Sequence, residues 1–304
     1  MSLQEYYEGF LLAVNRMKKD GANIEVYVFE IGSRAKLESL LGTMEMEDLH
    51  LLIGGMTDDQ IKILSDFTKR HNIKYIIPFS SKNSEVQNNN NIFQVNSPQS
   101  YLYSKASRVF MEIFRNANVV IVNVSGYSDK AEFLSTLKSD LKRKNVRYNE
   151  ISLTSNFSTD ILPLLQNNVE NVIIPSTGDS GALREITNAL DKVHQAHQGI
   201  NTRLFGYPEW QTYNPEIKKA LHQYGTYFYT SFYVDEQDIE TSKFIENFKF
   251  WYGRELINTY PKYGLFGYDT GIFFLNAVHR FGTNFEQRIN RIPSNSLQFA
   301  FNFE

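Results

Sequence analysis

Short apolar runs rich in β-branched residues alternate with longer amphipathic stretches along almost the whole chain of 304 residues. Each run has the composition of a buried strand, and each longer stretch repeats its apolar residues at helical spacing. Because parallel strands need helical crossovers between them, the alternation predicts parallel sheets that are covered by helices on both faces. The expected strands are Glu25–Phe29, His50–Ile53, Lys74–Ile77, Ile92–Val95, Asn118–Val124, Arg147–Leu153, Asn171–Ile174, Arg203–Phe205 and Thr226–Phe232.

The helical stretches separate these strands, and one parallel sheet does not easily hold so many strands. Two α/β lobes are therefore predicted. In open sheets of this kind, ligands bind beyond the carboxyl ends of the strands, so the residues directly after each strand are the candidates for a binding site. The expected helices are Gln4–Lys19, Arg34–Leu41, Thr57–Arg70, Ser100–Arg115, Lys130–Lys144, Ser158–Gln166, Ser180–His194, Asn214–Gln223, Asp235–Tyr252 and Tyr268–Arg280.

Composition excludes several classes of site. The chain has no cysteine, which excludes disulfides, thiolate metal sites and cysteine nucleophiles. Its formal net charge of −3 provides no basic excess to hold phosphates, and this argues against a nucleic-acid partner. No apolar run reaches the roughly 18–20 residues that a membrane-spanning helix needs. No signal peptide is visible at the start of the chain.

Two strand ends in the first third of the chain carry small and hydroxyl-bearing residues. Gly55 and Met56 follow the first of these strands and precede a helix, where backbone N–H groups favour a carboxylate. Phe79, Ser80 and Ser81 follow the next strand, where two hydroxyl groups could bind an anionic group beside an apolar wall. Ordinary turns explain both segments equally well.

Three strand ends farther along the chain carry a second set of candidates. Tyr127 offers a ring and a hydroxyl group after one strand, and Ser176 and Thr177 follow another. Glu209 lies between aromatic residues after a third strand, a combination that suits an ammonium group. Each residue taken alone is more often a packing residue or a solvated one.

The order of these segments resembles the leucine/isoleucine/valine-binding-protein family of type I periplasmic binding proteins. The similar segments are the helix that contains Gly9 and Ala13, the strand and turn Lys74–Ser81, the segment Asn156–Ile174, and Tyr260–Thr270 with its Gly-Tyr-Asp-Thr element. The resemblance covers nearly the whole chain, and it is carried by the order and spacing of the segments together.

The resemblance implies two doubly wound parallel-sheet lobes that are joined by a three-crossover hinge. Lobe 1 would comprise residues 1–96 and 235–282, and lobe 2 would comprise residues 97–234 and 283–304. Such a protein captures a solute by hinge closure, without bond chemistry and without a cofactor. It would reside in the periplasm or cell envelope and deliver its ligand to a membrane transporter.

Site residues are also implied by the resemblance. An amino-acid carboxylate would lie near Gly55–Met56 and Phe79–Ser81, with Tyr127 on the second lobe and Glu209 receiving the ligand's ammonium group. Thr177 stands where many family members have an aromatic residue, and Met56 replaces a small polar residue. These departures leave open whether the ligand is an ordinary amino acid or a related polar molecule, such as a peptidoglycan fragment.

The chain departs from the family at both ends. Family members place a strand before the first helix, in the centre of the first sheet, and no such strand is found here. A longer precursor with upstream residues is the simplest explanation. At the other end, Phe299–Phe303 stops near an expected strand without the closing segment that is usual in the family.

Two other functions remain open. An interaction module of the same fold could have a vestigial cleft filled by Met56, Phe79 and Trp210. It would dock to cell-wall enzymes, as penicillin-binding-protein activators do, or be linked to a peptidoglycan-binding LysM repeat. A sugar- or nucleobase-binding regulator that lacks its DNA-binding head is a third possibility.

Catalytic and metal chemistry has little support in the sequence. His194 and His197 have a spacing that a metal can use, but no third ligand accompanies them, and a solvated helix end is the preferred interpretation. No glycine-rich phosphate loop or nucleophile elbow is found. We therefore expect neither a metal nor catalytic residues.

Overall fold

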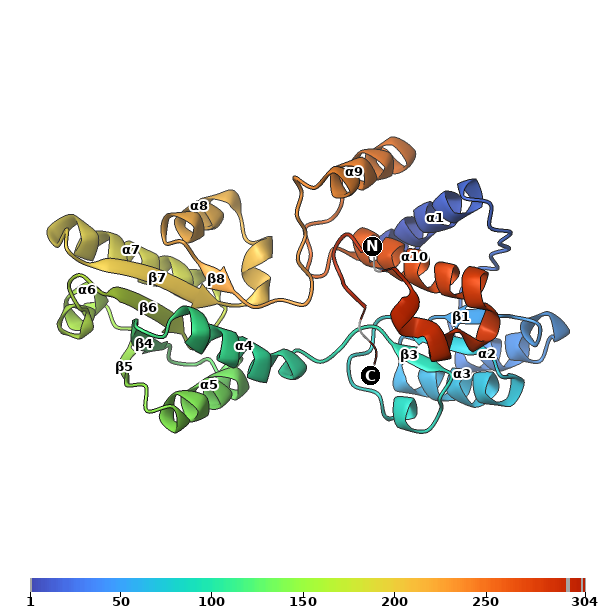
Figure 1. The fold of residues 1–304 in the computed structure, drawn as a ribbon, viewed down its shortest axis with the longest axis horizontal. Coiled ribbons are helices and arrows are strands. Elements are labelled where there is room, and N and C mark those ends of the chain that lie inside the picture. The colour runs from blue at the N-terminus through green and yellow to red at the C-terminus, as the bar shows by residue number, and fades with distance from the viewer. Residues whose placement is uncertain (1, 294–295, 302, 304) are drawn as a thin grey trace. The chain divides into compact units, whose positions relative to one another are not determined.

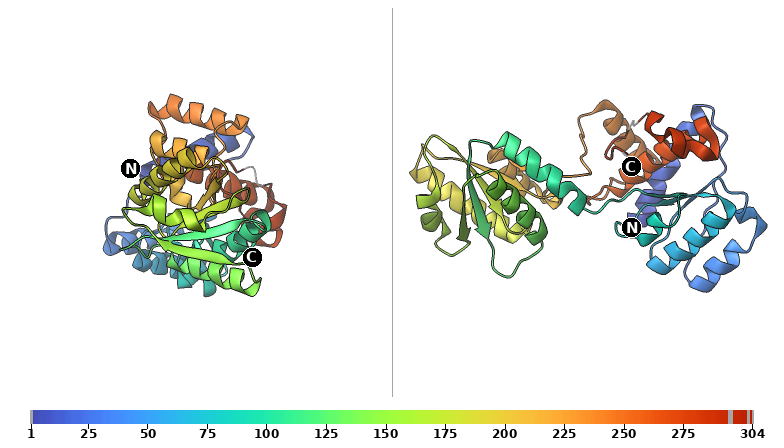
Figure 2. Two further views of the ribbon diagram at one scale, coloured as in Figure 1. Left: turned by 90° about the vertical axis from the view of Figure 1, so that its left-hand side faces the viewer. Right: turned by 60° about the horizontal axis from the view of Figure 1, so that its bottom comes forward.

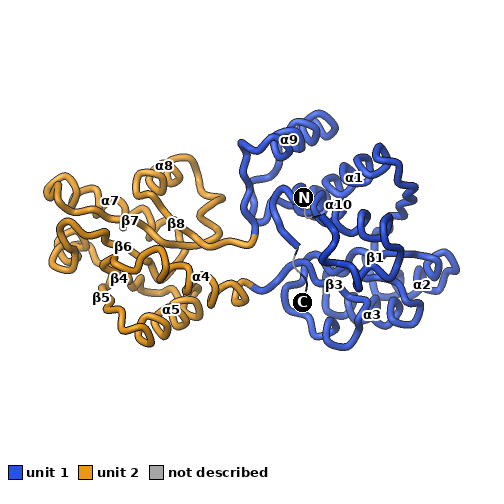
Figure 3. Tube along the Cα trace, viewed as in Figure 1, with its two compact units in different colours: residues 1–98, 232–304 blue, residues 99–231 orange. Residues whose placement is uncertain are grey.

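A computed structural model describes residues 2–293, 296–301 and 303, which form two compact units. Unit 1 is built from two runs of chain, 1–98 and 232–304, and unit 2 is the continuous run 99–231. Figure 3 shows unit 1 in blue and unit 2 in orange. The chain therefore passes from unit 1 to unit 2 after Pro98 and returns at Phe232.

Unit 1 contains a three-stranded parallel sheet in the order β1-β2-β3 (Figure 1). Alternate side chains of its strands enter two different cores, as the two-residue period of a strand requires. Tyr75 and Ile77 pack with helices α2 and α3 on one face, whereas Ile76 lies in the core formed with α1 and α10. The elements involved are α1 (Ser2–Lys19), α2 (Arg34–Leu41), η1 (Met44–Met46), β1 (Leu51–Ile53), α3 (Asp58–His71), β2 (Lys74–Ile77), η2 (Ser84–Gln87), β3 (Ile92–Gln94), α9 (Ile239–Tyr252), α10 (Tyr263–Phe281) and η5 (Gly282–Arg291).

Helices α1 and α10 pack against each other along their lengths, at a distance that only small residues allow. A Cβ atom added to Gly9 would lie 1.8 Å from the carbonyl oxygen of Gly264. Farther along, a Cβ on Gly271 would lie 2.5 Å from the Cβ of Ala13. The glycine and alanine of the first helix, which contributed to the family resemblance, therefore serve the close contact of the two helices.

Unit 2 contains a five-stranded parallel sheet in the order β5-β4-β6-β7-β8. Helices α4 and α5 pack together on one side of this sheet, and α7 and α8 lie on the other (Figure 2). Because β4 and β6 are covered on both faces, they are apolar almost throughout and fully buried in their centres. The elements of unit 2 are α4 (Ser100–Ile113), β4 (Asn118–Asn123), α5 (Ala131–Arg143), β5 (Tyr148–Ser152), α6 (Phe157–Ile161), η3 (Leu162–Leu164), β6 (Glu170–Pro175), α7 (Ser180–Ala196), β7 (Asn201–Gly206), η4 (Pro208–Thr212), α8 (Pro215–Gln223) and β8 (Tyr227–Phe228).

The strand predicted at Glu25–Phe29 is not formed, and this prediction was wrong. The segment contains Val26, Tyr27, Val28 and Phe29, all exposed, and none of its residues is in a strand. Among the described residues, β1 pairs only with β2, so no strand lies beside this segment to accept its backbone groups. β-branched composition produces a strand only where a second strand supplies the hydrogen bonds.

Residues 283–304 were expected in the second lobe, but the structure places them with unit 1. Phe285 and Ile292 are buried in the core formed with α10, and Phe301 stacks on Phe273 at 4.6 Å between ring centroids. The buried Asp269 carboxylate also accepts the backbone N–H groups of residues 297–299 at 2.7–3.0 Å. The third crossing that was expected near Gly282 is therefore not formed, because this last stretch packs against the helix that precedes it.

Several predicted boundaries also shift. The strand expected over Thr226–Phe232 shortens to Tyr227–Phe228, since it pairs with β7 through only two residues at the edge of the sheet. Helix α10 begins at Tyr263, five residues before the predicted start at Tyr268. Helix formation there is favoured by the buried contact with α1, a tertiary effect that local sequence signals do not report.

Candidate functional site

The first strand end of unit 1 brings Gly55 and Met56 to the start of α3. Gly55 has a φ of 84°, in the left-handed region that glycine adopts without strain. The backbone N–H of Met56 donates to the side-chain oxygen of Gln60 at 2.9 Å, and the Met56 side chain is half exposed. This N–H, which was expected to be available for a ligand carboxylate, already has a protein partner.

The second strand end of unit 1 holds Phe79, Ser80 and Ser81. Phe79 packs edge-on against Tyr6 at 4.9 Å between ring centroids. The Ser80 hydroxyl lies 3.4 Å from the carbonyl oxygen of Lys82. Within the described part of the chain, the Ser81 hydroxyl has no hydrogen-bond partner, and the residue is partly exposed. Ser81 is thus the residue of this turn that is best able to bind a ligand.

Unit 2 brings its predicted residues together at the carboxyl ends of three adjacent strands. Ser176 and Thr177 follow β6, in the centre of the sheet. The Ser176 hydroxyl accepts the backbone N–H of Val124 at 2.8 Å and so ties the ends of β4 and β6 together. Thr177 is buried, and its hydroxyl accepts the N–H of Asp179 at 3.1 Å. Both hydroxyl groups therefore shape the turn instead of facing solvent.

Tyr127 lies beyond the end of β4 with its ring nearly half exposed. Its hydroxyl is hydrogen-bonded to Asp179, and the negative charge of that carboxylate raises the pKa of the Tyr127 hydroxyl above its ordinary value. Asp179 in turn caps helix α7 by accepting the N–H of Ala182 at 2.9 Å. Asp179 was not predicted as a site residue, although it follows a strand end just as Thr177 does.

Glu209, in η4 beyond β7, forms an ion pair with Lys130, and the same ammonium lies 3.5 Å from Asp129. Burial alone raises the pKa of Asp129, but the Thr177 hydroxyl, the Gly178 N–H and the Lys130 ammonium outweigh it and lower that pKa below its usual value. Asp129 and Lys130 were not predicted as site residues, because Tyr127 alone was chosen from the loop after this strand.

The loop after β6 is held by aromatic side chains from η4 and its end. The Trp210 indole N–H and the Tyr213 hydroxyl both donate to the carbonyl oxygen of Gly178. A Cβ on Gly178 would lie 1.8 Å from the carboxylate of Glu209, so a larger residue there would force that carboxylate to shift. Trp210 itself is buried in the core of unit 2, not in a position to fill a vestigial cleft.

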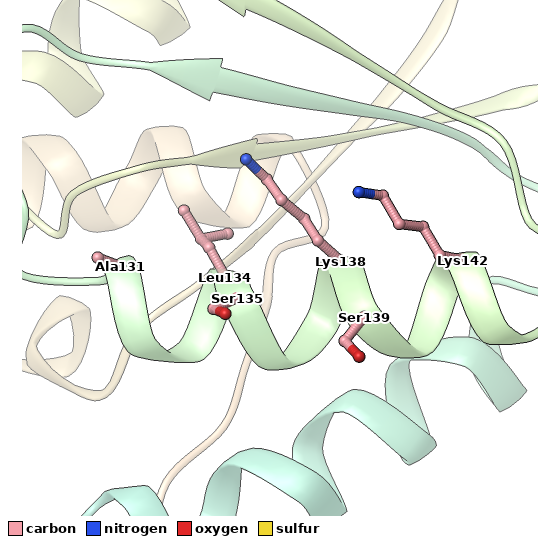
Figure 4. A pocket seen from close by; sticks show the side chains of 6 residues that line it. All are labelled: Ala131, Leu134, Ser135, Lys138, Ser139 and Lys142. Atoms are coloured by element: carbon pink, nitrogen blue, oxygen red, sulfur yellow. The ribbon is translucent and has the colours of Figure 1, made fainter.

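Two hollows on the surface of the described residues lie away from these strand ends. One, of about 450 Å³, is lined by six residues that all come from helix α5, including Lys138 and Lys142 (Figure 4). Since no second element contributes to it, it is an open helix face and not a binding site. Another, of about 440 Å³, lies between α1 and the unpaired segment at Ile24–Tyr27.

Among the described residues, no group of three or more His, Asp or Glu side chains could hold a metal ion.

His194 was predicted to lie at a solvated helix end, and the structure corrects this prediction in part. Its ring nitrogen lies 2.9 Å from the Thr202 hydroxyl, and burial lowers its pKa below the ordinary value of histidine. This contact fixes the ring against β7.

The described residues contain no helix that is both long and apolar enough to span a membrane.

Neither a protein-family model nor a curated protein sequence matches the chain. Solved structures do. A protein of Rhodospirillum rubrum assigned to branched-chain amino acid ABC transport aligns with a TM-score of 0.62 at 13% identity, over 95% of this chain and 83% of that one. The chain has the type I periplasmic-binding-protein fold.

Two further structures share this fold. An ABC transporter substrate-binding protein of Desulfitobacterium hafniense, in complex with Leu, aligns with a TM-score of 0.55 at 14% identity, over 98% of this chain and 88% of that one. An ABC-type branched-chain amino acid transporter protein of Rhodopseudomonas palustris aligns with a TM-score of 0.56 at 14% identity, over 95% and 79%. At these identities the likeness establishes the fold, and the predicted fold class is confirmed.

Proposed function

We propose that this chain is a non-catalytic solute-binding receptor that captures a small polar ligand with residues at the ends of its strands. The observation that carries the proposal is the cluster in unit 2, where Tyr127, Glu209, Asp129 and Asp179 gather at the carboxyl ends of adjacent strands. In doubly wound sheets this is where ligands bind. The Desulfitobacterium protein of the same fold holds Leu, which supports a receptor role.

The partner that fits this proposal is the membrane part of an ABC transporter, and the place of action is outside the cytoplasm. Structures with this fold are those of ABC transporter substrate-binding proteins. In unit 1, the Ser81 hydroxyl group forms no hydrogen bond with a described residue, and we propose it as the ligand contact of that unit. Gly55, Met56, Phe79 and Ser80 would then shape the surroundings of that contact.

The test is a thermal-shift screen of the purified chain against amino acids, hydroxy acids, short peptides, muropeptides and sugars. A ligand at about 100 times its dissociation constant stabilises the protein by about 2.7 kcal/mol, which is a readable shift. The shift should be lost in Ser81→Ala and reduced in Tyr127→Phe. Ser139→Ala and Tyr27→Phe are matched controls, because both residues are exposed and neither of them follows a strand of the described structure.

Absence of a shift across the whole panel, from a protein that unfolds cooperatively, would contradict the receptor proposal. That outcome would favour the interaction module of the same fold. A shift that persists in both site variants would show that the ligand binds elsewhere.

A further inference from the structure

The ammonium of Lys130 is enclosed on three sides by groups of unit 2. Its side chain is 11% exposed, although lysine is rarely buried without a partner. The nitrogen pairs with Glu209, lies 3.5 Å from Asp129 and sits 4.8 Å above the centre of the Tyr207 ring. Two carboxylates and an aromatic face thus hold the one positive charge of this cluster.

A ligand's ammonium group would have to compete with Lys130 for the Glu209 carboxylate. That carboxylate lies close to the backbone of Gly178, where no side chain separates the two. An ammonium group from solution would have to displace a tethered one, whose effective concentration is far above that of a dissolved ligand. It would also leave the displaced Lys130 charge unpaired in a mostly buried position.

The groups that remain available at these strand ends accept hydrogen bonds. Asp129 and Glu209 present two carboxylates to the Lys130 ammonium, the Asp179 carboxylate binds the Tyr127 hydroxyl and the start of α7, and no other described Lys or Arg side chain forms an ion pair with these three acids. Such a site repels a ligand carboxylate. The place beside Glu209 where a ligand cation would bind most strongly is already occupied by the Lys130 ammonium group. The site can instead bind hydroxyl or amide groups, which donate hydrogen bonds without carrying a charge, and the exposed Tyr127 ring lies beside them.

We infer that Lys130 is a specificity-determining residue. Its ammonium group occupies the place beside Glu209 where a ligand's cation would bind. The site therefore binds a ligand that has an uncharged hydrogen-bond donor at the position where an amino acid carries its ammonium group. This inference rests on the proposed receptor function for its ligand, but the occupied cation position can be tested without one.

The first experiment is chemical rescue of Lys130→Ala by n-butylammonium chloride, followed by thermal unfolding. The variant should unfold at a lower temperature than the parent, and n-butylammonium should restore about half or more of that loss in a saturable manner. 1-Butanol and sodium chloride should not restore it. The parent, the Lys130→Ala/Glu209→Gln double variant and the exposed α5 control Lys142→Ala should not respond. Rescue by 1-butanol to the same extent, or no rescue, would overturn the assignment.

The second experiment compares L-leucine with 2-hydroxy-4-methylpentanoate, which differ only by a hydroxyl in place of the ammonium. By calorimetry, the parent should bind the hydroxy acid at least about tenfold more tightly than leucine, because leucine's ammonium finds no free carboxylate. Tighter binding of leucine that is lost in Glu209→Gln would overturn the inference. If the parent binds neither compound nor any other solute while the rescue holds, the receptor function fails and the role of Lys130 stands.

Discussion

The two units contain parallel sheets built from similar residues, but the sheet of unit 1 has three strands whereas the sheet of unit 2 has five. In unit 2, β4 and β6 each have a neighbour on either side. In unit 1, β2 alone has two neighbours, and β1 forms an edge in the described structure. The apolar segment Glu25–Phe29 is exposed and lies outside any strand, whereas the similar run Asn118–Asn123 is a buried strand. The difference shows that pairing partners, more than composition, decide which apolar run becomes a strand.

The largest expected effect separates the two units as folding units. Unit 2 is one continuous run with its own core, so a fragment of residues 99–231 should fold and unfold cooperatively. A fragment of residues 1–98 should not, because α1 packs on α10 from the other run of unit 1. Circular dichroism with urea unfolding of both fragments checks this. A cooperative transition in the 1–98 fragment would contradict the division of the core described above.

A smaller effect is expected on the pH dependence of stability, through the buried Asp269 carboxyl group that binds the last residues of unit 1. Burial raises the pKa of Asp269 to about 7 and outweighs the three N–H groups that the carboxylate accepts. The folded state therefore binds the proton more tightly than the unfolded chain, whose pKa is near 3.8. This stabilisation, of at most about 4 kcal/mol, is complete below pH 4 and is lost as pH rises through 7.

Urea unfolding of the parent and Asp269→Asn between pH 4 and 8 checks the direction. The free energy of unfolding of the parent, relative to the variant, should fall with rising pH over this window. Asp66→Asn, an exposed residue of α3, should leave the parent's pH profile unchanged. A relative stability that rises with pH would show that the N–H groups dominate and that the carboxylate is ionised throughout.

The smallest effect is expected in the unpaired segment. Val28→Ala should change the free energy of unfolding by less than about 0.5 kcal/mol, because the side chain is exposed. Val120→Ala, the same change in the buried centre of β4, should cost about 2 kcal/mol or more. Hydrogen exchange should likewise be fast at residues 24–30 and slow in β4. Equal costs for the two variants would mean that the segment pairs with another strand in solution.

Much of the fold could be predicted from the sequence because most strands here are buried on both faces and most helices carry one apolar face. The strands at Lys74–Ile77 and Asn118–Val124 were found within a residue by this signal. The strand-end rule also led to Tyr127, Thr177 and Glu209, which the structure gathers within unit 2.

The partners of these residues could not be predicted in the same way. Asp129 and Lys130 stand next to Tyr127 in sequence, but their meeting with Glu209, almost eighty residues away, depends on the order of strands in the sheet. The expectation that Glu209 receives a ligand's ammonium came from its aromatic neighbours in sequence and from the resemblance. The contact with Lys130 is what gives that carboxylate a different role.

The sequence by itself determined the alternation of strands and helices, the class of fold and the strand ends at which polar residues stand, because hydrophobic period and turn chemistry are local properties. Only the tertiary structure decided that Glu25–Phe29 stays unpaired, that Phe285, Ile292 and Phe301 pack in one core with α10, and that Lys130 neutralises Glu209. Each of these depends on which distant segment supplies a hydrogen bond, an apolar surface or a charge, and that information is not local.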